Sequence, residues 1–213
     1  MSNKSEREYR SMTLAVEERA EGGQERMVVS GYASTFDDPY KLWEDDSVEV
    51  WEKVDRSAFD ETDMSDVIMQ YDHAGRVFAR IRNNTLTVSP DEKGLFISAD
   101  LSGTDIGRIL YQEIAGGYTD RMSFGFTVDE DVREIVDDRT TGKSIVTRTI
   151  TKVGKLYDVS AVSMPANPGT SISARFLDGA IEEARAERLK AQELEEKREQ
   201  IMKRAEALGK VEA

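Results

Sequence analysis

Apolar and polar positions alternate in short runs through most of the chain, and this period-two pattern predicts β-strands. Two strands are expected around a Gly-Gly turn at residues 22–23, and a polar loop over residues 36–47 precedes the next strand. Further short strands are separated by turns at residues 83–84 and 90–94, where Asn, Pro and Gly gather. One strand ends in a polar turn that carries His73. The pattern therefore predicts a mainly antiparallel β domain.

The longest alternating runs lie in the second half of the chain. Residues 121–138 and 144–153 are two long runs joined across residues 139–143, and they predict a protruding β-hairpin. A separate last strand follows, which we expect to be stopped by Pro165 and Pro168.

One segment among the strands has helical spacing instead. Thr104 and Asp105 are good N-cap residues, and the glycines at residues 116–117 are suited to ending the helix. The apolar face is expected to consist of Ile106, Ile109, Leu110 and Ile114.

The chain changes character near its end. Residues 178–213 contain no proline and are rich in charge, while Leu194, Ile201 and Leu208 recur every seven positions. This spacing predicts a long charged helix with a thin apolar stripe. The helix is either a solvated, frayed one or one that associates with itself or a partner, and the pattern leaves these alternatives balanced. We accordingly divide the chain into a body, residues 1–177, and a helical tail.

The net charge is strongly negative and unevenly distributed. The chain carries a formal charge of −13, of which the tail, with ten acids and eight bases, holds −2. About −11 therefore falls on the body. Because affinity for nucleic acid depends on Lys and Arg contacts with phosphate, we expect no nucleic-acid partner, and no anionic membrane partner.

The chain has no cysteine and one histidine. The lack of cysteine excludes disulfides, thiolate nucleophiles and thiolate metal sites, and a single histidine excludes multi-histidine zinc sites. Carboxylate-only metal sites remain open, but no loop has EF-hand spacing, and we expect no metal ion and no cofactor. The first residues lack the apolar core of a signal peptide, and no run is long enough to span a membrane. We expect a soluble, intracellular protein.

Ser123 is the candidate nucleophile. Within residues 121–128 the large apolar side chains fall on one face of a strand, and Arg121, Ser123, Gly125 and Thr127 fall on the other. That second face is small and polar, so a peptide can approach it closely, and Gly125 keeps side-chain bulk away. We expect the hydroxyl of Ser123 to be accessible, and to become a nucleophile only with a base within hydrogen-bond reach.

His73 is the natural base, because imidazole exchanges protons near neutral pH. A third group should orient the ring, and without a second histidine it must be a carboxylate. We favour Asp158, since an acid inside a hydrophobic strand needs a partner. Asp72 ranks lower because neighbours along a chain seldom face each other, and Glu49 and Glu52 are weaker alternatives.

From the residues alone, a catalytic triad is the minority interpretation. A lone histidine in a turn is more often an ordinary surface residue, and a serine in a strand is usually just a small residue. Asp158 could equally form a plain ion pair with Arg121 or Lys155.

Five segments, in their order along the chain, resemble the prohead maturation proteases of tailed bacteriophages, serine proteases whose fold is akin to that of the herpesvirus assemblins. The segments are GYASTFDD (31–38), EVWEKVDRSAFDE (49–61), MQYDHAG (69–75), the run from GLFISADL to RMSFGF (94–126) and LYDVSAVSMPANPGTSI (156–172). The resemblance extends from about Met12 to about Arg175, and Ser57 stands where the family usually has glycine.

The resemblance implies both a fold and a set of site residues. The fold would be mainly β, of the α+β class, with an antiparallel, β-barrel-like core of the herpesvirus-protease type. One or two packed helices, the protruding hairpin and the charged C-terminal helix would complete it. His73 would be the base and Ser123 the nucleophile, and phage members commonly carry Glu or Asp at the place of Asp158. Backbone N–H groups would form the oxyanion hole.

The resemblance also implies a function, that of a serine endopeptidase inside the assembling prohead in the host bacterial cytoplasm. Major capsid protein, scaffold segments and the protease itself would be its substrates. The tail would contact scaffold or capsid protein, form a homodimer or higher oligomer, or be removed by self-cleavage. The alternatives are a non-enzymatic scaffold or adaptor that organises capsid assembly through its C-terminal helix, and an inactive structural subunit of the same fold.

Overall fold

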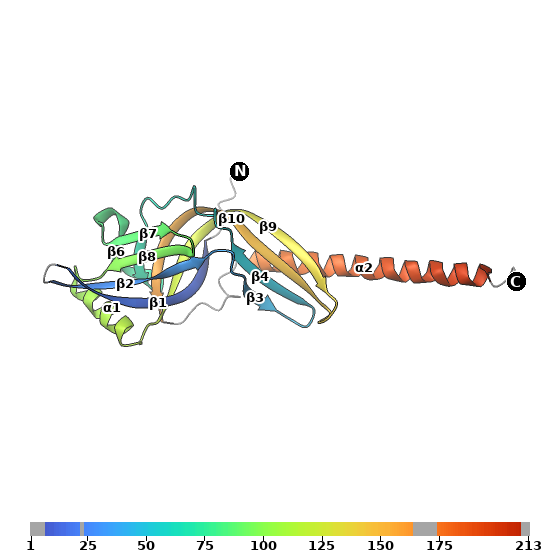
Figure 1. The fold of residues 1–213 in the computed structure, drawn as a ribbon, viewed down its shortest axis with the longest axis horizontal. Helices are drawn as coiled ribbons and strands as arrows, with labels where there is room; N and C mark the ends of the chain where they lie inside the picture. The colour runs from blue at the N-terminus through green and yellow to red at the C-terminus, as the bar shows by residue number, and fades with distance from the viewer. Residues whose placement is uncertain (1–6, 22–23, 164–173, 210–213) are drawn as a thin grey trace.

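The computed structural model describes residues 7–21, 24–163 and 174–209, in which ten strands form one sheet with two α-helices and a 3-10 turn (Figure 1). The strands are β1 (Glu8–Glu21), β2 (Gln24–Thr35), β3 (Tyr40–Glu44), β4 (Val48–Val54), β5 (Ile68–Tyr71), β6 (Ala74–Arg80), β7 (Leu86–Pro90), β8 (Gly94–Asp100), β9 (Arg121–Asp138) and β10 (Lys143–Val162). The helices are α1 (Asp105–Ala115) and α2 (Ala174–Gly209), and the 3-10 turn is η1 (Ile81–Asn83).

Most of these elements lie where the sequence pattern predicted them. One exception is β3, which occupies part of the region expected to be a polar loop. The predicted turn at residues 22–23 and the strand stop at Pro165 and Pro168 lie outside the described residues.

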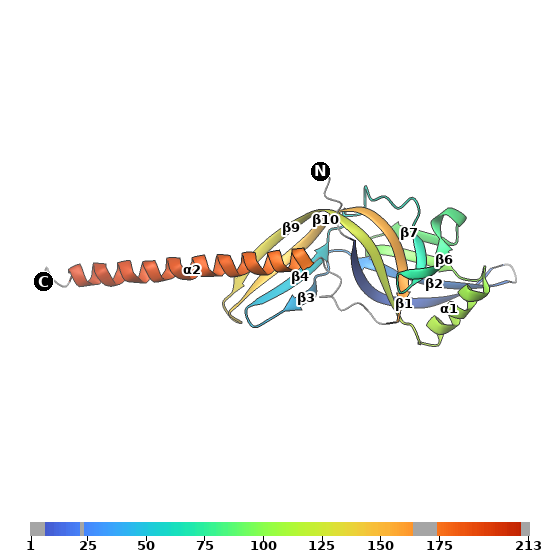
Figure 2. The same ribbon diagram turned by 180° about the vertical axis from the view of Figure 1, so that it is seen from behind.

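The sheet runs in the order β3-β4-β10-β9-β1-β2-β8-β7, with β5 joined to β10 and β6 joined to β5. Figure 2 shows the fold from behind, with the start of α2 beside β4. Most neighbours are antiparallel, but β10 runs parallel to both β4 and β5. In the part of the chain that the structure describes, the path ends at β3 and β7 and does not close. The mainly β, α+β class is thus confirmed, whereas the closed, barrel-like core is not observed. Because β10 is long enough to hold β4 beside one half and β5 beside the other, the sheet branches instead.

The predicted protruding hairpin is formed by β9 and β10, whose tip lies beside β3 and β4 (Figure 1). Gly142, with φ of 71°, supplies the left-handed position of its turn. The expectation of a separate last strand after residue 153 is wrong, because β10 runs on without a break to Val162. Register shifts between Ile150 and Asp158 bend the strand without ending it.

The main hydrophobic core lies between the curved sheet and α1. Its largest fully buried side chains include Phe59, Met69, Leu95, Ile97, Phe124 and Phe126. Thr104 caps α1 as predicted, accepting a hydrogen bond from the Gly107 N–H at 3.1 Å. Leu110 and Ile114 are buried, but Ile109, expected on the same face, is 53% exposed. The buried stripe of α1 is therefore narrower than the sequence pattern suggested.

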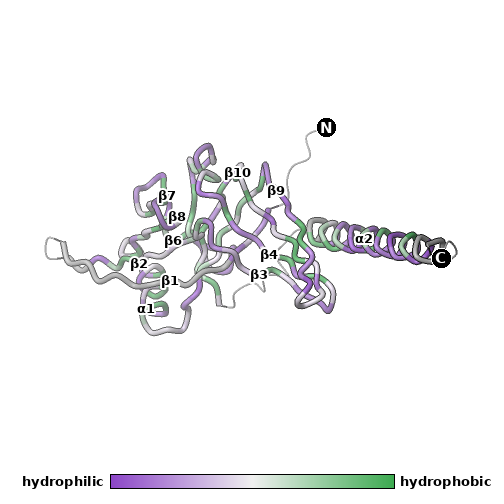
Figure 3. The backbone as a smooth tube through the Cα atoms, turned by 45° about the vertical axis from the view of Figure 1, so that its right-hand side comes forward, coloured by the Kyte–Doolittle hydropathy of each residue, from purple (hydrophilic) through white to green (hydrophobic). Residues whose placement is uncertain are grey.

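The second helix packs only its first turns on the body. Ala180 and Ala184 are buried against Val48, Val50 and Val146 of β4 and β10. The rest of α2 projects beyond the body (Figure 1), with strongly hydrophilic and apolar positions mixed along it (Figure 3). The long charged helix is thus present, and it begins at Ala174, before the predicted start.

Four charged side chains, all buried, tie the N-terminal strand to the far side of the sheet. Arg10 of β1 donates to both carboxylate oxygens of Glu52 of β4 at 2.5 and 2.7 Å, and Arg148 of β10 donates to Glu8 at 2.8 and 3.0 Å. Since two strands separate β1 from β4 in the sheet order, a flat sheet would place them about 14 Å apart. Their direct contact means that the sheet is strongly curled.

Electrostatic complementarity keeps this buried network charged. Burial opposes ionisation of Glu52, but Arg10, Arg148 and the hydroxyl of Tyr40 together outweigh it and hold the pKa of Glu52 below its usual range. Burial likewise opposes the charge of Arg10, and Glu52 more than compensates, so the pKa of Arg10 is raised. Tyr40 donates its hydroxyl to Glu52 at 2.5 Å, and burial together with that carboxylate raises the pKa of Tyr40. Hydrophobic periodicity alone carries no signal for this network.

Replacing Glu52 with Gln should destabilise the fold by about 3 kcal/mol, because Arg10 and Arg148 would keep their buried charge with one carboxylate fewer. The matched control is Glu61→Gln, which breaks an exposed 2.6 Å ion pair with Lys152 and should leave the free energy of unfolding nearly unchanged. Urea unfolding at neutral pH, where both carboxylates are ionised, measures the two free energies. Equal losses in the two variants would contradict the role given to the network.

Candidate active site

Asp72 and His73 form a two-residue turn between β5 and β6, closed by the pair Tyr71–Ala74. Both residues have left-handed φ values, 47° and 56°, although such turns usually carry Asn-Gly. The Asp72 carboxylate accepts hydrogen bonds from the N–H and the hydroxyl of Ser163, both at 2.9 Å. These hydrogen bonds fix the turn to the end of β10. The role of Asp72 is therefore to anchor the turn. Non-glycine residues in this conformation are strained, and such strain gathers at functional sites.

The imidazole of His73 meets the carboxylate of Asp158, with 2.5 Å between Nδ1 and Oδ1. Asp158 lies on β10, is 1% exposed and pairs with Ile68, the first residue of β5. A carboxylate accepts hydrogen bonds, so Nδ1 carries the proton and Nε2 keeps its lone pair. The structure therefore brings together His73 and the carboxylate that the sequence analysis favoured.

Asp158 has further neighbours that the sequence analysis missed. Ser160 donates its hydroxyl to Oδ1 at 2.8 Å, and Arg7 Nη1 lies 3.7 Å from Oδ2. A Cβ at Gly125 would stand 2.6 Å from Oδ2 and 2.9 Å from Tyr9 Cε1. Gly125 therefore makes room for the carboxylate and for Tyr9, rather than for an approaching peptide as expected. Ser160 could have been found by alternation, since it lies two positions after Asp158 on the same strand.

Ser123 lies on β9 between two other serines, paired in register with Ser160 of β10 and Ser11 of β1. Residues directly opposite on neighbouring strands point to the same face, with Cβ atoms about 5 Å apart. Ser123 therefore shares the face of the sheet that holds Ser160 and the carboxylate of Asp158. His73 contacts that face as well, through Asp158 and through the ring of Tyr9, whose centroid lies 4.3 Å from that of the imidazole.

The expectation that Ser123 is accessible is wrong, because the residue is fully buried. Its Oγ and the Nε2 of His73 are both buried and have no hydrogen-bond partner among the described residues. An unsatisfied buried polar atom costs about 1–3 kcal/mol, so such atoms are uncommon and call for a reason. Here two of them, one able to donate a proton and one able to accept it, belong to the same small cluster.

Residues 7–9, called the N-terminal cover below, lie over this cluster. The guanidinium of Arg7 stacks 3.9 Å from the ring centre of Tyr157, and Tyr9 packs edge-on against His73. Residues 8–13 of β1 pair with Arg121–Phe126 of β9, the stretch that contains Ser123. The chain's own N-terminal strand thus explains the burial of Ser123, an arrangement that a local sequence pattern does not reveal.

The other acids considered for the site are engaged elsewhere. Glu49 accepts from the indole of Trp51 at 3.0 Å and pairs with Lys143 at 3.3 Å, and Glu52 belongs to the buried network. Lys155, an alternative partner for Asp158, pairs with Asp63 at 2.7 Å instead.

Two further features are absent from the residues that the structure describes. No group of three or more His, Asp or Glu side chains is arranged to hold a metal ion there. None of the helices described is both long and apolar enough to cross a membrane.

A search of curated proteins finds no significant match. Among solved structures, the capsid assembly protease gp21 of bacteriophage T4 is similar, with 11% sequence identity and a TM-score of 0.43. The alignment covers 76% of this chain and all of the T4 chain.

The family described as caudovirus prohead serine protease matches residues 14–184, a stretch that includes His73, Ser123 and Asp158. The match covers well over half of the chain. The chain therefore belongs to the caudovirus prohead serine proteases, and is a protease of phage capsid maturation.

Proposed function

We propose that this prohead protease is a serine endopeptidase in which Ser123 is the nucleophile, His73 the general base and Asp158 the carboxylate that orients the imidazole. The observation that carries the proposal is the pair of buried, unpartnered atoms, Ser123 Oγ and His73 Nε2, beside the 2.5 Å contact of His73 with Asp158. Family membership supports the same assignment, since these proteases are named for a serine.

The reaction is acyl transfer. Ser123 Oγ attacks the peptide carbonyl while Nε2 of His73 takes its proton, and the imidazolium then protonates the leaving amine. Asp158 keeps the proton of the neutral ring on Nδ1 and stabilises the imidazolium. A water molecule repeats the sequence and releases the acyl product. The hydrogen bond from Ser123 to His73, absent in the covered site, forms when substrate binds, as catalytic hydrogen bonds often tighten only in the complex.

A peptide reaches Ser123 only if the N-terminal cover moves. Arg7 is the exposed member of the cover, with 41% of its side chain accessible, and its 3.7 Å contact with Asp158 is long for an ion pair. Tyr9 is held against His73 by an edge-on ring contact, which contributes about 1 kcal/mol. Substrate binding can displace these two weak contacts, but opening the site also has to release Glu8, the buried member of the cover, from the charged network.

The expected substrates are the proteins that surround a prohead protease during capsid assembly. We propose that the enzyme cleaves the major capsid protein and scaffold segments, and also itself, inside prohead shells assembling in the bacterial cytoplasm. The body carries about −11 of the total charge of −13, which disfavours contact with DNA phosphates. An acidic protease or its fragments would therefore not be retained by DNA during packaging.

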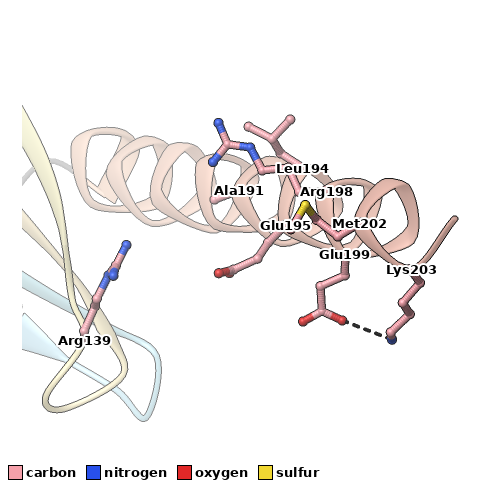
Figure 4. A pocket seen from close by; sticks show the side chains of 8 residues that line it. All are labelled: Arg139, Ala191, Leu194, Glu195, Arg198, Glu199, Met202 and Lys203. Atoms are coloured by element: carbon pink, nitrogen blue, oxygen red, sulfur yellow. Dashed lines mark ion pairs between the residues drawn. The ribbon is translucent and has the colours of Figure 1, made fainter. Parts of the chain in front are cut away.

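We propose that the projecting part of α2 directs the protease to scaffold or capsid protein. Leu194 and Ile201 of its apolar stripe are 54% and 66% exposed. A shallow cavity of about 610 Å³ between this helix and the hairpin tip at Arg139 is lined mostly by charged side chains (Figure 4). The helix thus offers a mixed apolar and charged surface of the kind that another amphipathic helix covers.

Ser123→Ala should abolish self-cleavage and processing of capsid protein precursor while leaving the fold intact, because one buried hydroxyl without a partner is removed. His73→Ala should have the same effect. Overnight incubation of the purified chain, analysed by mass spectrometry, measures the first activity, and co-expression with the precursor measures the second. Ser144→Ala, another buried serine, is the control and should remain active. Processing that persists in Ser123→Ala would show that Ser123 is not the nucleophile. Absence of processing by the unmodified chain would favour the alternative, a scaffold or adaptor without enzymatic activity.

Tyr9→Ala should raise the initial rate of hydrolysis of an unfolded protein such as labelled casein about fivefold, because loss of the ring contact releases about 1 kcal/mol of restraint on the cover. The matched control is Tyr32→Ala, which removes an edge-on contact with Phe96 on β2 and β8. A decrease in rate for Tyr9→Ala would show that Tyr9 supports His73 rather than restricting access.

Truncation after Arg188 removes the projecting helix and keeps the turns that pack on β4 and β10. It should reduce incorporation into proheads strongly without changing casein hydrolysis. The double change Leu194→Glu and Ile201→Glu in the full chain should act in the same direction, whereas Gln192→Glu with Gln200→Glu, which adds the same charge away from these two apolar residues, should not. Normal incorporation of the truncated protein, quantified by gel analysis of purified proheads, would disprove the targeting role.

A further inference from the structure

Ser160 is a fully buried serine to which no role in the reaction has been assigned. Its hydroxyl donates to Oδ1 of Asp158 at 2.8 Å, and that same oxygen receives Nδ1 of His73 at 2.5 Å. Because an oxygen of a carboxylate has two lone-pair directions, these two donors occupy both. Ser160 thus supplies the second hydrogen bond to Oδ1, the oxygen that accepts the hydrogen bond from His73.

The other carboxylate oxygen is held less firmly. Oδ2 faces Arg7 at 3.7 Å, and Arg7 belongs to the N-terminal cover, which has to move before a peptide can bind. Once Arg7 has left, the contacts of Asp158 with described side chains are those with His73 and Ser160. A carboxylate held by His73 alone could rotate about its χ2 angle, which is a soft torsion.

We infer that Ser160 is a positioning residue: it fixes the carboxylate of Asp158 so that Oδ1 stays directed at His73 when the cover is open. This inference rests on the proposed function of the site. Ser160 does not touch the reacting atoms, although it lies directly opposite Ser123 across the β9–β10 pair. It acts through Asp158, and its own hydroxyl proton stays in place throughout the reaction.

The inference predicts two consequences for Ser160→Ala. Without the hydroxyl, the negative charge on Oδ1 is less compensated, so it favours the imidazolium more strongly and the midpoint of the His73 titration moves to higher pH. Without the hydroxyl the carboxylate is also less well oriented, so kcat falls while KM stays the same. A decrease of about tenfold corresponds to the loss of a hydrogen bond to a charged group.

The first consequence can be measured without any activity. Since His73 is the only histidine, a ¹⁵N-histidine-labelled full-length chain gives a single set of ring signals, and a Ser123→Ala background prevents self-cleavage. Ser160→Ala should raise the titration midpoint, and Ser160→Thr, which keeps a hydroxyl, should restore it. Asp158→Asn is the positive control and should lower the midpoint by removing the negative partner.

Ser144→Ala is the matched negative control. Ser144 is also a fully buried serine of β10, and its hydroxyl donates to Asp137 at 2.7 Å, far along the strand from the site. It should leave the midpoint unchanged. A Ser160→Ala midpoint equal to that of the Ser144→Ala variant would overturn the inference, whether or not the enzyme cleaves peptides.

The second consequence is measured by casein hydrolysis in the chain that retains Ser123. A kcat about tenfold lower in Ser160→Ala, with KM within twofold and recovery in Ser160→Thr, supports a positioning role. An unchanged kcat overturns it. If Ser123→Ala were as active as the unmodified chain, the proposed function would fail instead, and the titration would still report whether Ser160 orients the His73–Asp158 pair.

Discussion

The buried carboxylate of Asp158 is the constraint on which the site depends. An isolated buried charge is costly, so Asp158 needs partners, and it has hydrogen bonds with His73 and Ser160 and a longer ion contact with Arg7. Each partner comes from a different part of the chain: a strained turn, the strand of Asp158 itself and the N-terminal cover. The missing side chain at Gly125 leaves the space in which the carboxylate lies. The geometry of the site therefore compensates the buried charge of Asp158 with partners from three parts of the chain.

Strand β10 is what brings these parts together. Its parallel pairing with β5 delivers the His73 turn to the end of the strand, where Asp72 is tied to Ser163. Its antiparallel pairing with β9 places Ser123 beside Ser160. Its other half pairs with β4 and contributes Arg148 to the buried network that curls the sheet. One strand thus serves both the site and the fold, and the register shifts in its middle allow it to bend between the two.

Sequence patterns predicted the features that depend on residues close together in the chain. Alternation located most strands and the hairpin, and an acid within an apolar strand was enough to favour Asp158 as the partner of His73. The burial of Ser123, by contrast, depends on a strand that lies more than a hundred positions earlier in the chain, and β1 pairs with β9 through backbone atoms that leave no mark on composition. The network of Glu8, Arg10, Glu52 and Arg148 is missed for the same reason. The burial of each of these side chains makes sense only because the others are its partners. Glu52, a weak candidate for catalysis, is thus a member of an ion-pair network that stabilises the fold.

This network also bears on how the cover can open. Peeling the first residues of β1 away from the sheet removes Glu8 and Arg10 together, one negative and one positive charge. Arg148 would remain in contact with Glu52 at 3.0 Å and with Asp131 at 2.8 Å, and its guanidinium would not be left alone. On the other side of the strand, loss of Arg7 leaves Asp158 with His73 and Ser160. Because neither buried cluster is left with an unpaired charge, the N-terminal strand can leave the site without disrupting the groups that would carry out the reaction, and the same interactions that stabilise the covered state permit an open one.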